Sequence, residues 1–305
     1  MITIRTMTSE DVDCVSELDS IAFGAYWSGK NIGGAYKRTR ENVGSSLRLN
    51  PAGCFVAADE KTVGYIFSRR WGKIGWIGTF GIHPDYRGRG IGKSLLEKAL
   101  GVLVASGCRI IGLETMADSP YNIGLYLRSG FCAAYPTLNL CKRPSPSGEA
   151  ASFVLLHQVG SGKALPYIRQ LSEACFPGLD YAAEAKSAEE EGWGETLLIG
   201  WPKPWAFVIV RTVPGYQRAE PTADVAALVI HPENGRRLQD VLNAAEKFAY
   251  DRKVPQMNLS LNTGEGGPLK QVMGHGFRIS RAMLRMVLNG IVMKTEGITL
   301  SRWAM

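Results

Sequence analysis

The chain has 305 residues, the length of two ordinary domains, and a formal net charge of +7. Hydrophobic residues make up 45% of it, which is enough for packed cores and excludes a disordered or fibrous protein. No apolar run approaches the ~18 residues of a membrane-spanning helix, and the first residues lack the apolar stretch of a secretory signal. We therefore expect a folded cytoplasmic protein with no membrane partner.

The basic residues are scattered, because no block of Lys and Arg reaches the roughly five residues typical of a nucleic-acid tail. The charge permits an anionic small ligand, and no nucleic-acid partner is expected. The six cysteines form no Cys-x-x-Cys pair, and only four histidines are present. We therefore predict reduced thiols and no metal site.

In the first half, the sequence predicts an opening strand at residues 2–5 and then a helix that Thr8 or Ser9 can cap. Apolar residues recur at helical spacing at Val12, Val15, Leu18 and Ala22. Residues 24–46, rich in Gly, Tyr, Lys and Arg, are interpreted as a mobile segment with a second short helix.

Beyond this segment the predicted order is three strands, a long helix, a strand, a helix and a strand. The three strands cover residues 54–58, 63–68 and 75–82. The later elements are a helix at about 92–106 ended by Gly107, a strand at 109–114, a helix at about 122–128 and a strand after Gly130.

The second half repeats this order. Strands are predicted at 197–199, 205–210, 224–230 and 256–261, with a helix at about 236–252 before the last of them. A His-Pro pair at 83–84 recurs 148 residues later, and a Gly-Phe pair at 130–131 recurs 146 residues later. Matching order and a nearly constant offset indicate an internal duplication. Residues 142–150, rich in Pro and Ser, favour a linker, so we predict domains at 1–142 and 153–305 joined by residues 143–152.

One stretch carries the chemistry: residues 83–94 read His-Pro-Asp-Tyr-Arg-Gly-Arg-Gly-Ile-Gly-Lys-Ser, between a strand and the long helix. Gly88, Gly90 and Gly92 let the backbone turn tightly, and the helix start adds unpaired N–H groups and partial positive charge. The combination is a cradle for an anion. Nucleoside-triphosphate and dinucleotide loops both fit poorly, because position 87 is Arg where the former needs Gly and the glycine spacing differs from the latter.

The loop instead fits the pattern Arg/Gln-x-x-Gly-x-Gly, and here the chain resembles the GCN5-related N-acetyltransferase (GNAT) family. Leu113-Glu114 resembles the family's fifth strand, and residues 125–131 resemble its Tyr-x-x-x-Gly-Phe segment. The resemblance covers most of residues 1–142. It implies an α/β fold (α+β mixed sheet) of two tandem acetyltransferase-like domains, each a central, mostly antiparallel sheet flanked by helices.

The resemblance also implies that acetyl-CoA is the cofactor. Its pyrophosphate is expected on Arg87, Gly88, Arg89, Gly90, Ile91, Gly92 and Lys93. Its pantetheine arm is expected to pair with the backbone of Phe80, Gly81 and Ile82 like an added strand. Ser119 takes the place of the family's usual cofactor-binding Asn, a departure that removes one expected hydrogen bond.

An amine must lose its proton before it attacks a thioester, and the leaving thiolate needs a proton. By resemblance, Tyr126 is the catalytic acid and Glu114 the general base, directly or through water. Alternatively, Tyr126 only packs its helix on the sheet, and Glu114 only binds substrate or pairs with Arg109 or another neighbour. His83 is a second candidate base.

The acceptor is expected to be a small-molecule or peptide amine. In the family its pocket involves the first helices, where this chain has Phe23, Tyr26, Trp27, Tyr36, Lys37, Arg38 and Arg40. The alternative is that these rings belong to the core. The sequence does not select among a small amine, an antibiotic, an amino acid, a polyamine and a protein amine, and it leaves the acyl length and the oligomeric state open.

The second half looks degenerate. Only one glycine follows His231-Pro232, Glu233 and Asp240 would repel a pyrophosphate, and Val272 takes the place of Tyr126. We expect an acetyl-CoA-dependent N-acetyltransferase whose second domain packs on the first and shapes the acceptor site. The alternative is a non-catalytic acyl-CoA-binding or sensor protein.

Overall fold

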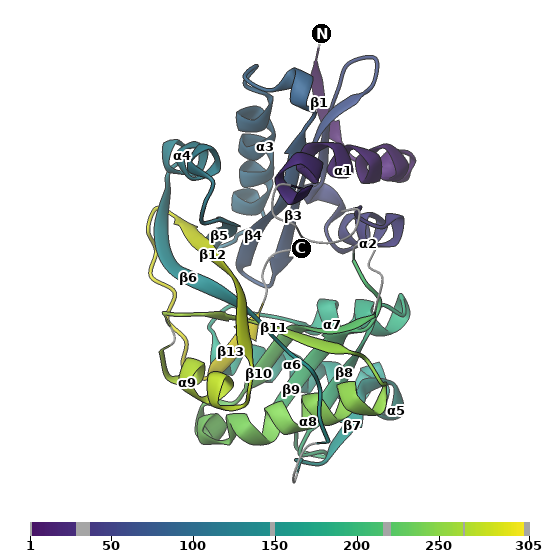
Figure 1. Ribbon diagram of the computed structural model, residues 1–305, viewed down its shortest axis with the longest axis vertical. Helices are drawn as coiled ribbons and strands as arrows, with labels where there is room; N and C mark the ends of the chain where they lie inside the picture. The colour runs from purple at the N-terminus through teal and green to yellow at the C-terminus, as the bar shows by residue number, and fades with distance from the viewer. Residues whose placement is uncertain (1, 29–36, 147–149, 216–220, 265, 302–305) are drawn as a thin grey trace.

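The computed structural model describes residues 2–28, 37–146, 150–215, 221–264 and 266–301 (Figure 1). The strands are β1 (Thr3–Thr6), β2 (Phe55–Ala58), β3 (Thr62–Trp71), β4 (Ile74–Ile82), β5 (Ile110–Met116), β6 (Phe131–Lys142), β7 (Phe153–Leu155), β8 (Gly194–Ile199), β9 (Ala206–Arg211), β10 (Thr222–Ile230), β11 (Gln256–Asn262), β12 (Arg278–Leu288) and β13 (Ile298–Ser301). The helices are α1 (Val12–Ser28), α2 (Arg40–Leu49), α3 (Ile91–Ala105), α4 (Pro120–Arg128), α5 (Leu156–Val159), α6 (Ser161–Cys175), α7 (Ala182–Glu190), α8 (Leu238–Asp251) and α9 (Gly266–Gly274).

One mixed sheet runs through both halves, in the order β1-β2-β3-β4-β5-β12-β6-β11-β10-β9-β8-β7, with β13 on β10. Its neighbours are antiparallel apart from β4–β5 and β10–β11, so the predicted fold class is confirmed. The halves exchange strands, because β12 lies between β5 and β6, and β6 lies between β12 and β11 (Figure 1). The predicted domain boundary at residues 143–152 therefore stays a prediction, because one continuous sheet contains strands from both sides of it.

Local signals explain why the predicted elements form. Asp11 accepts a hydrogen bond from the backbone N–H of Thr8 at 2.8 Å, which closes a capping box just before α1. Gly107 (φ 75°) ends α3 in the left-handed region that favours glycine. Gly130 and Gly276, of the two Gly-Phe pairs, share this conformation with φ of 86° and 93°. The duplication is therefore visible in the backbone as well as in the sequence.

Alternation along β3 separates the two helical layers that cover the first half. Tyr65 belongs to the core under α1, whereas its neighbour Ile66 belongs to the core under α3. In the second half, α8 covers one face of the sheet and α6 the other. Among the described residues, no helix combines the length and apolar character that a membrane crossing requires.

The start of the predicted linker is anchored to the second half. Glu246 of α8 is buried and accepts hydrogen bonds from Lys142 Nζ at 2.8 Å and from the Ser145 backbone N–H at 2.9 Å. Burial alone would raise the pKa of this carboxyl, but the hydrogen bonds from Lys142 and Ser145 bring the pKa below its ordinary value. The last strand of the first half is thereby fastened to a helix of the second.

A buried ion pair joins the halves on the other side of the sheet. Arg69 of β3 donates from Nη1 to both carboxylate oxygens of Glu184 on α7, at 2.9 and 2.7 Å, and the indole N–H of Trp71 donates to the same carboxylate at 3.1 Å. Both charged side chains are less than a tenth exposed. Removal of one charge would leave the other buried without its partner.

We predict that Glu184→Gln lowers the free energy of unfolding by about 3 kcal/mol, because the Arg69 guanidinium stays buried without its counter-charge. Urea denaturation measures the change. The matched control is Glu190→Gln on the same helix, where the carboxylate meets Lys186 at 3.6 Å on the surface, and the expected change there is within about 0.5 kcal/mol. Equal effects of the two substitutions would contradict a buried charge pair.

Candidate active site

The site begins where two parallel strands separate. β4 and β5 pair only as far as Ile77 and Leu113. There β4 has a bulge, in which Gly78 and Thr79 oppose a single residue of β3, and a bulge bends its strand. At Phe80, Gly81 and Ile82, the edge of β4 that faces β5 has no strand partner in the described chain, so the backbone N–H and C=O groups on that edge can bind another extended segment.

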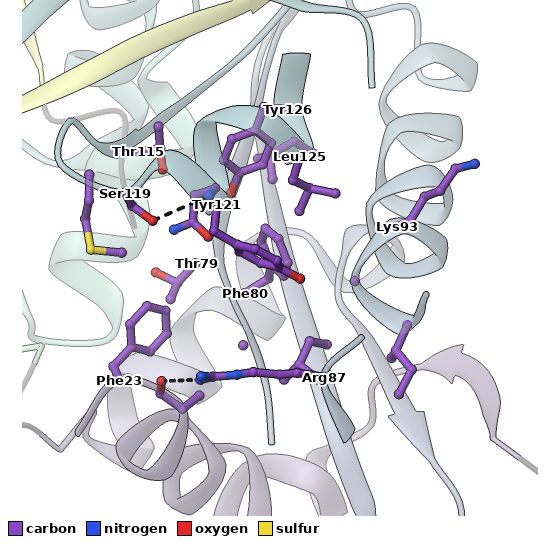
Figure 2. A pocket seen from close by; sticks show the side chains of 18 of the residues that line it. Phe23, Thr79, Phe80, Arg87, Lys93, Thr115, Ser119, Tyr121, Leu125 and Tyr126 are labelled. Atoms are coloured by element: carbon purple, nitrogen blue, oxygen red, sulfur yellow. Dashed lines mark hydrogen bonds between the residues drawn. The ribbon is translucent and has the colours of Figure 1, made fainter. Parts of the chain in front are cut away.

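A pocket of about 680 Å³ opens at this separation. Its walls come from α1, β4, the loop before α3, the end of β5, α4 and β12 (Figure 2). With one exception, Arg89, the predicted site residues line it: Phe80, Gly81, Ile82, Arg87, Gly88, Gly90, Ile91, Gly92, Lys93, Glu114, Ser119 and Tyr126.

The glycine loop has the conformation that an anion cradle requires. Gly88 and Gly90 have φ of 76° and 77°, and Gly90 is the N-cap of α3. A Cβ at either position would meet no atom within 4 Å, so backbone conformation, not space, selects glycine here. The first turn of α3 holds no acidic residue, and its N–H groups and dipole therefore favour an anion.

The three basic residues of the loop differ in where their side chains lie. Arg87 donates to the carbonyl of Ala22 at 2.9 Å, and its guanidinium extends from the loop to α1 (Figure 2). Lys93 lines the pocket from the first turn of α3, but its Nζ points away from it, 3.7 Å from Glu97 Oε1 (Figure 2). Arg89 does not line it, because its guanidinium lies 4.9 Å from the ring centroid of Tyr86 on the preceding turn.

Tyr126 on α4 combines the packing role and the pocket-facing role that the sequence left as alternatives. Its ring meets Phe80 and Phe131 edge to face, with centroids 6.1 and 5.9 Å apart, and the residue is 6% exposed. Its hydroxyl points into the pocket (Figure 2), and no described residue hydrogen-bonds to it. Burial raises the pKa of Tyr126 well above its ordinary value, so the phenol stays protonated at neutral pH.

Ser119 serves as the N-cap of α4. Its hydroxyl accepts a hydrogen bond from the backbone N–H of Asn122 at 3.4 Å, while the residue lines the pocket. Its short side chain is thus already used within α4. This agrees with the departure from the family's pattern at position 119.

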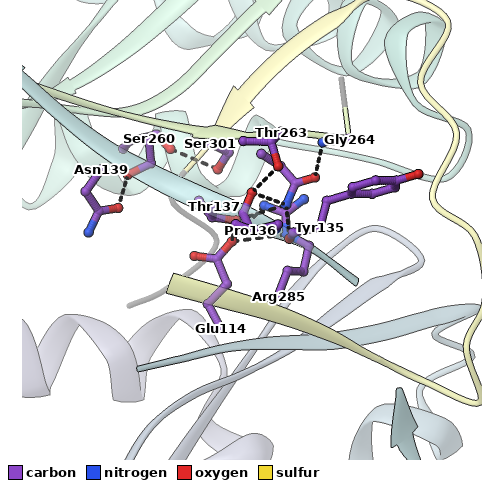
Figure 3. Close-up of polar contacts among 12 residues, drawn as sticks. Glu114, Tyr135, Pro136, Thr137, Asn139, Ser260, Thr263, Gly264, Arg285 and Ser301 are labelled. Atoms are coloured by element: carbon purple, nitrogen blue, oxygen red, sulfur yellow. Dashed lines mark hydrogen bonds and ion pairs between the residues drawn. The ribbon is translucent and has the colours of Figure 1, made fainter. Parts of the chain in front are cut away.

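Glu114 is held by a residue of the second half. Its Oε1 accepts hydrogen bonds from Thr137 Oγ1 at 2.6 Å and from Arg285 Nε and Nη2 at 3.1 and 2.7 Å (Figure 3). The carboxylate side chain is 1% exposed. Its partner is therefore Arg285, directly opposite on β12, and not Arg109. Oε2 makes no hydrogen bond with a described residue, and Glu114 is one of the residues that line the pocket.

The second half also lines the pocket. Arg281 and Met283 of β12 are part of its wall, next to the end of β5. Sequence reasoning missed both, because no local pattern shows that β12 lies beside a strand made some 170 residues earlier. Their signal is indirect: β12 follows the second Gly-Phe pair as β6 follows the first.

Other candidate residues lie elsewhere. His83 does not line the pocket, since its Nδ1 accepts the Asp85 backbone N–H at 3.3 Å and caps a turn. Phe23 lines the pocket, whereas Arg38 is fully buried, with Nε 3.1 Å from Asp19. The aromatic candidate Tyr36 lies outside the described residues, and so do the side chains of Tyr26 and Trp27.

The corresponding loop of the second half has a different structure. His231 caps a turn as His83 does, accepting the Glu233 N–H at 3.4 Å. The chain then passes from this turn into α8 without a residue of positive φ. Arg237 pairs with Asp240 at 2.8 Å, within the first turn of α8, and Val272 is fully buried in the core.

We predict that Arg285→Gln lowers the free energy of unfolding by about 3 kcal/mol, because Glu114 keeps a buried charge without its partner. Adding Glu114→Gln should recover part of the loss, since the uncompensated charge is then removed. Urea denaturation of both single variants and the double variant completes the cycle. Additive effects would contradict the coupling of these two residues.

Comparison with known proteins agrees with this geometry. Residues 15–131 match the model of the acetyltransferase (GNAT) family. A putative acetyltransferase from Pyrococcus horikoshii superposes with a TM-score of 0.70 at 20% identity, over 99% of this chain and 95% of that one. A GCN5-related N-acetyltransferase from Sphaerobacter thermophilus gives 0.62 at 13% identity, over 100% and 98%.

A tandem GNAT protein from the clavulanic acid biosynthesis pathway gives a TM-score of 0.59 at 15% identity, over 98% of this chain and 99% of that one. At such identities the likeness concerns the fold, and it extends over both halves. The chain thus has a tandem GNAT fold, and its residues 15–131 are a domain of the acetyltransferase (GNAT) family.

Proposed function

We propose that this chain is an acetyl-CoA-dependent N-acetyltransferase that transfers the acetyl group to a primary amine by direct attack on the thioester. One observation carries the proposal: a single pocket joins the glycine loop, the open edge of β4, the Tyr126 phenol and the Glu114 carboxylate. The loop supplies an anion site, the edge supplies a partner for an amide chain, and the two side chains supply proton transfer.

The residues present fit acetyl-CoA. The loop amides at Gly88 to Gly92, with Arg87 and Lys93, would hold the pyrophosphate, and the backbone of Phe80, Gly81 and Ile82 would pair with the amides of the pantetheine arm. When bound, acetyl-CoA supplies an acyl group activated as a thioester. Gly81 is needed for this wall, because a Cβ there would lie 2.9 Å from the Ala22 side chain and 3.0 Å from the Tyr65 ring.

Two side chains would move protons. Tyr126 would donate from Oη to the sulfur that leaves, and its apolar surroundings keep this proton in place at neutral pH. Glu114 would accept a proton from the amine at Oε2, directly or through water, while Thr137 and Arg285 fix Oε1. The ion pair supports the non-catalytic alternative as well, since it gives Glu114 a structural task.

The second half would act on the acceptor side. Arg281 and Met283 enter the pocket wall from β12, next to the end of β5. The loop before α8 offers no glycine cradle, and Asp240 adds a negative charge to the first turn of that helix. We therefore propose one acetyl-CoA site per chain, in the first half.

Calorimetric titration with acetyl-CoA tests the site. We expect one equivalent per chain, and we expect Gly90→Val with Gly92→Val to weaken binding at least tenfold, because valine disfavours the positive φ of Gly90 and the two side chains fill the cradle. Gly101→Ala, in open space on the same helix, is the control and should leave affinity unchanged. Retained affinity in the double variant would refute the loop assignment, and two equivalents would refute a silent second half.

Replacement of the phenol tests the chemistry. We expect Tyr126→Phe to lower kcat about 100-fold or more without changing acetyl-CoA affinity, as loss of a general acid does. Because the pKa of Tyr126 is raised, the rate should show no loss from its deprotonation up to a pH of about 10. Thiol release over an amine panel measures both.

Tyr121→Phe is the matched control, since Tyr121 also lines the pocket from α4 but is 67% exposed. We expect this variant to keep its kcat. Unchanged turnover in Tyr126→Phe would remove the acid role. Binding without turnover of any amine in the unmodified chain would favour the non-catalytic alternative.

A further inference from the structure

The second half contains the same separation of strands as the first. β10 and β11 pair in parallel only as far as Asp224 and Asn258, and a bulge of β10 against β9 follows at Ala226. Thr222, where this pairing begins, lies 148 residues after Ile74, where β4 begins to pair with β5. This is the offset of the two His-Pro pairs. The duplication has therefore preserved the slot between the parallel strands.

In the second half this slot is filled by the chain itself. β13 (Ile298–Ser301) pairs antiparallel with β10, from Ile298 opposite Ile230 to Ser301 opposite Ala227, and it also contacts β11. At the same offset of 148, residues 227–230 correspond to residues 79–82 of β4. Of those four residues, Phe80, Gly81 and Ile82 belong to the open edge in the first half.

We propose that β13 is a built-in occupant of the second half's acyl-arm slot. The ligand class that such a slot takes is an extended chain of amides, because the open edge of a strand offers alternating N–H and C=O groups. In the first half, by the proposed function on which this equivalence rests, that chain is a pantetheine arm. In the second half it is the protein's own strand β13.

Gly297, the residue just before β13, lies at the entrance to the slot, where only a glycine fits. A Cβ on Gly297 would lie 2.5 Å from the Ile230 carbonyl oxygen and 2.6 Å from Cys175 Sγ, which leaves no room for any other residue. Just before it, the backbone N–H of Glu296 donates to the Cys175 carbonyl at 2.9 Å. Pro232, of the second His-Pro pair, lies beside this entrance.

The inner end is equally closed. Leu300 is 1% exposed and belongs to the core under α8. The Ser301 hydroxyl donates to the Ala226 carbonyl at 3.0 Å, at the bulge itself. The second half is therefore silent for two separate reasons: its loop has lost the glycine cradle, and its slot has gained a permanent occupant. Rebuilding the cradle alone would not restore binding.

Hydrogen exchange at residue resolution, on the full chain with and without acetyl-CoA, tests the proposal. We expect the amides of residues 227–230 that face β13 to exchange slowly in both conditions. The corresponding amides of residues 79–82 should exchange fast without acetyl-CoA and slow at least tenfold when it is added. Fast exchange on the β13 side of β10 in the free protein, or slowing there on addition of acetyl-CoA, would overturn the proposal.

The point variant Gly297→Ala keeps every other residue of the strand. We expect it to speed exchange at residues 227–230 at least tenfold, whereas the control Gly101→Ala leaves them unchanged. Unchanged exchange in Gly297→Ala would refute the tight entrance. If residues 79–82 fail to respond to acetyl-CoA, the proposed function fails, while the result at residues 227–230 still decides the role of β13.

Discussion

The rest of the structure depends on the backbone hydrogen bonds of two strand edges, at the points where β4 separates from β5 and β10 separates from β11. A parallel pair that parts after a bulge leaves a row of N–H and C=O groups on one strand edge, and such groups need partners when they are buried. In the first half the row lies along a pocket, between the glycine loop and Tyr126. In the second half β13 pairs with the corresponding backbone groups of β10. The same local geometry thus borders an open pocket in one half and a strand-filled slot in the other.

The exchange of strands makes the two halves one unit. β12 lies between β5 and β6, so the wall of the pocket beside Glu114 belongs to the second half. Arg285 compensates the charge of that carboxylate, and Arg69 with Glu184 ties the halves together on the opposite flank. Residues that line one pocket, such as Glu114 and Arg281, therefore lie far apart in the sequence. The pocket is built from both halves of the chain.

Features set by neighbouring residues were predictable from the sequence. The glycine loop and α3 depend on local conformation and on an apolar stripe, and both were found where predicted. Pairings between distant segments were not, because registers such as Arg285 with Glu114 depend on which strands meet. The direction of Arg89 was also missed, since it follows from the nearby ring of Tyr86. β13 has only four residues, which is too short for its sequence pattern to predict a strand or its pairing partner.

The position of β12 also affects how the protein folds during its synthesis. A ribosome delivers β5 and β6 long before β12, yet these two strands are joined in the sheet only through β12, which lies between them. Through that interval both present bare edges, the feature through which nascent strands aggregate. The first half cannot complete its sheet until residues 278–288 have been translated. A premature stop before residue 278 would therefore harm the half that it leaves intact in sequence.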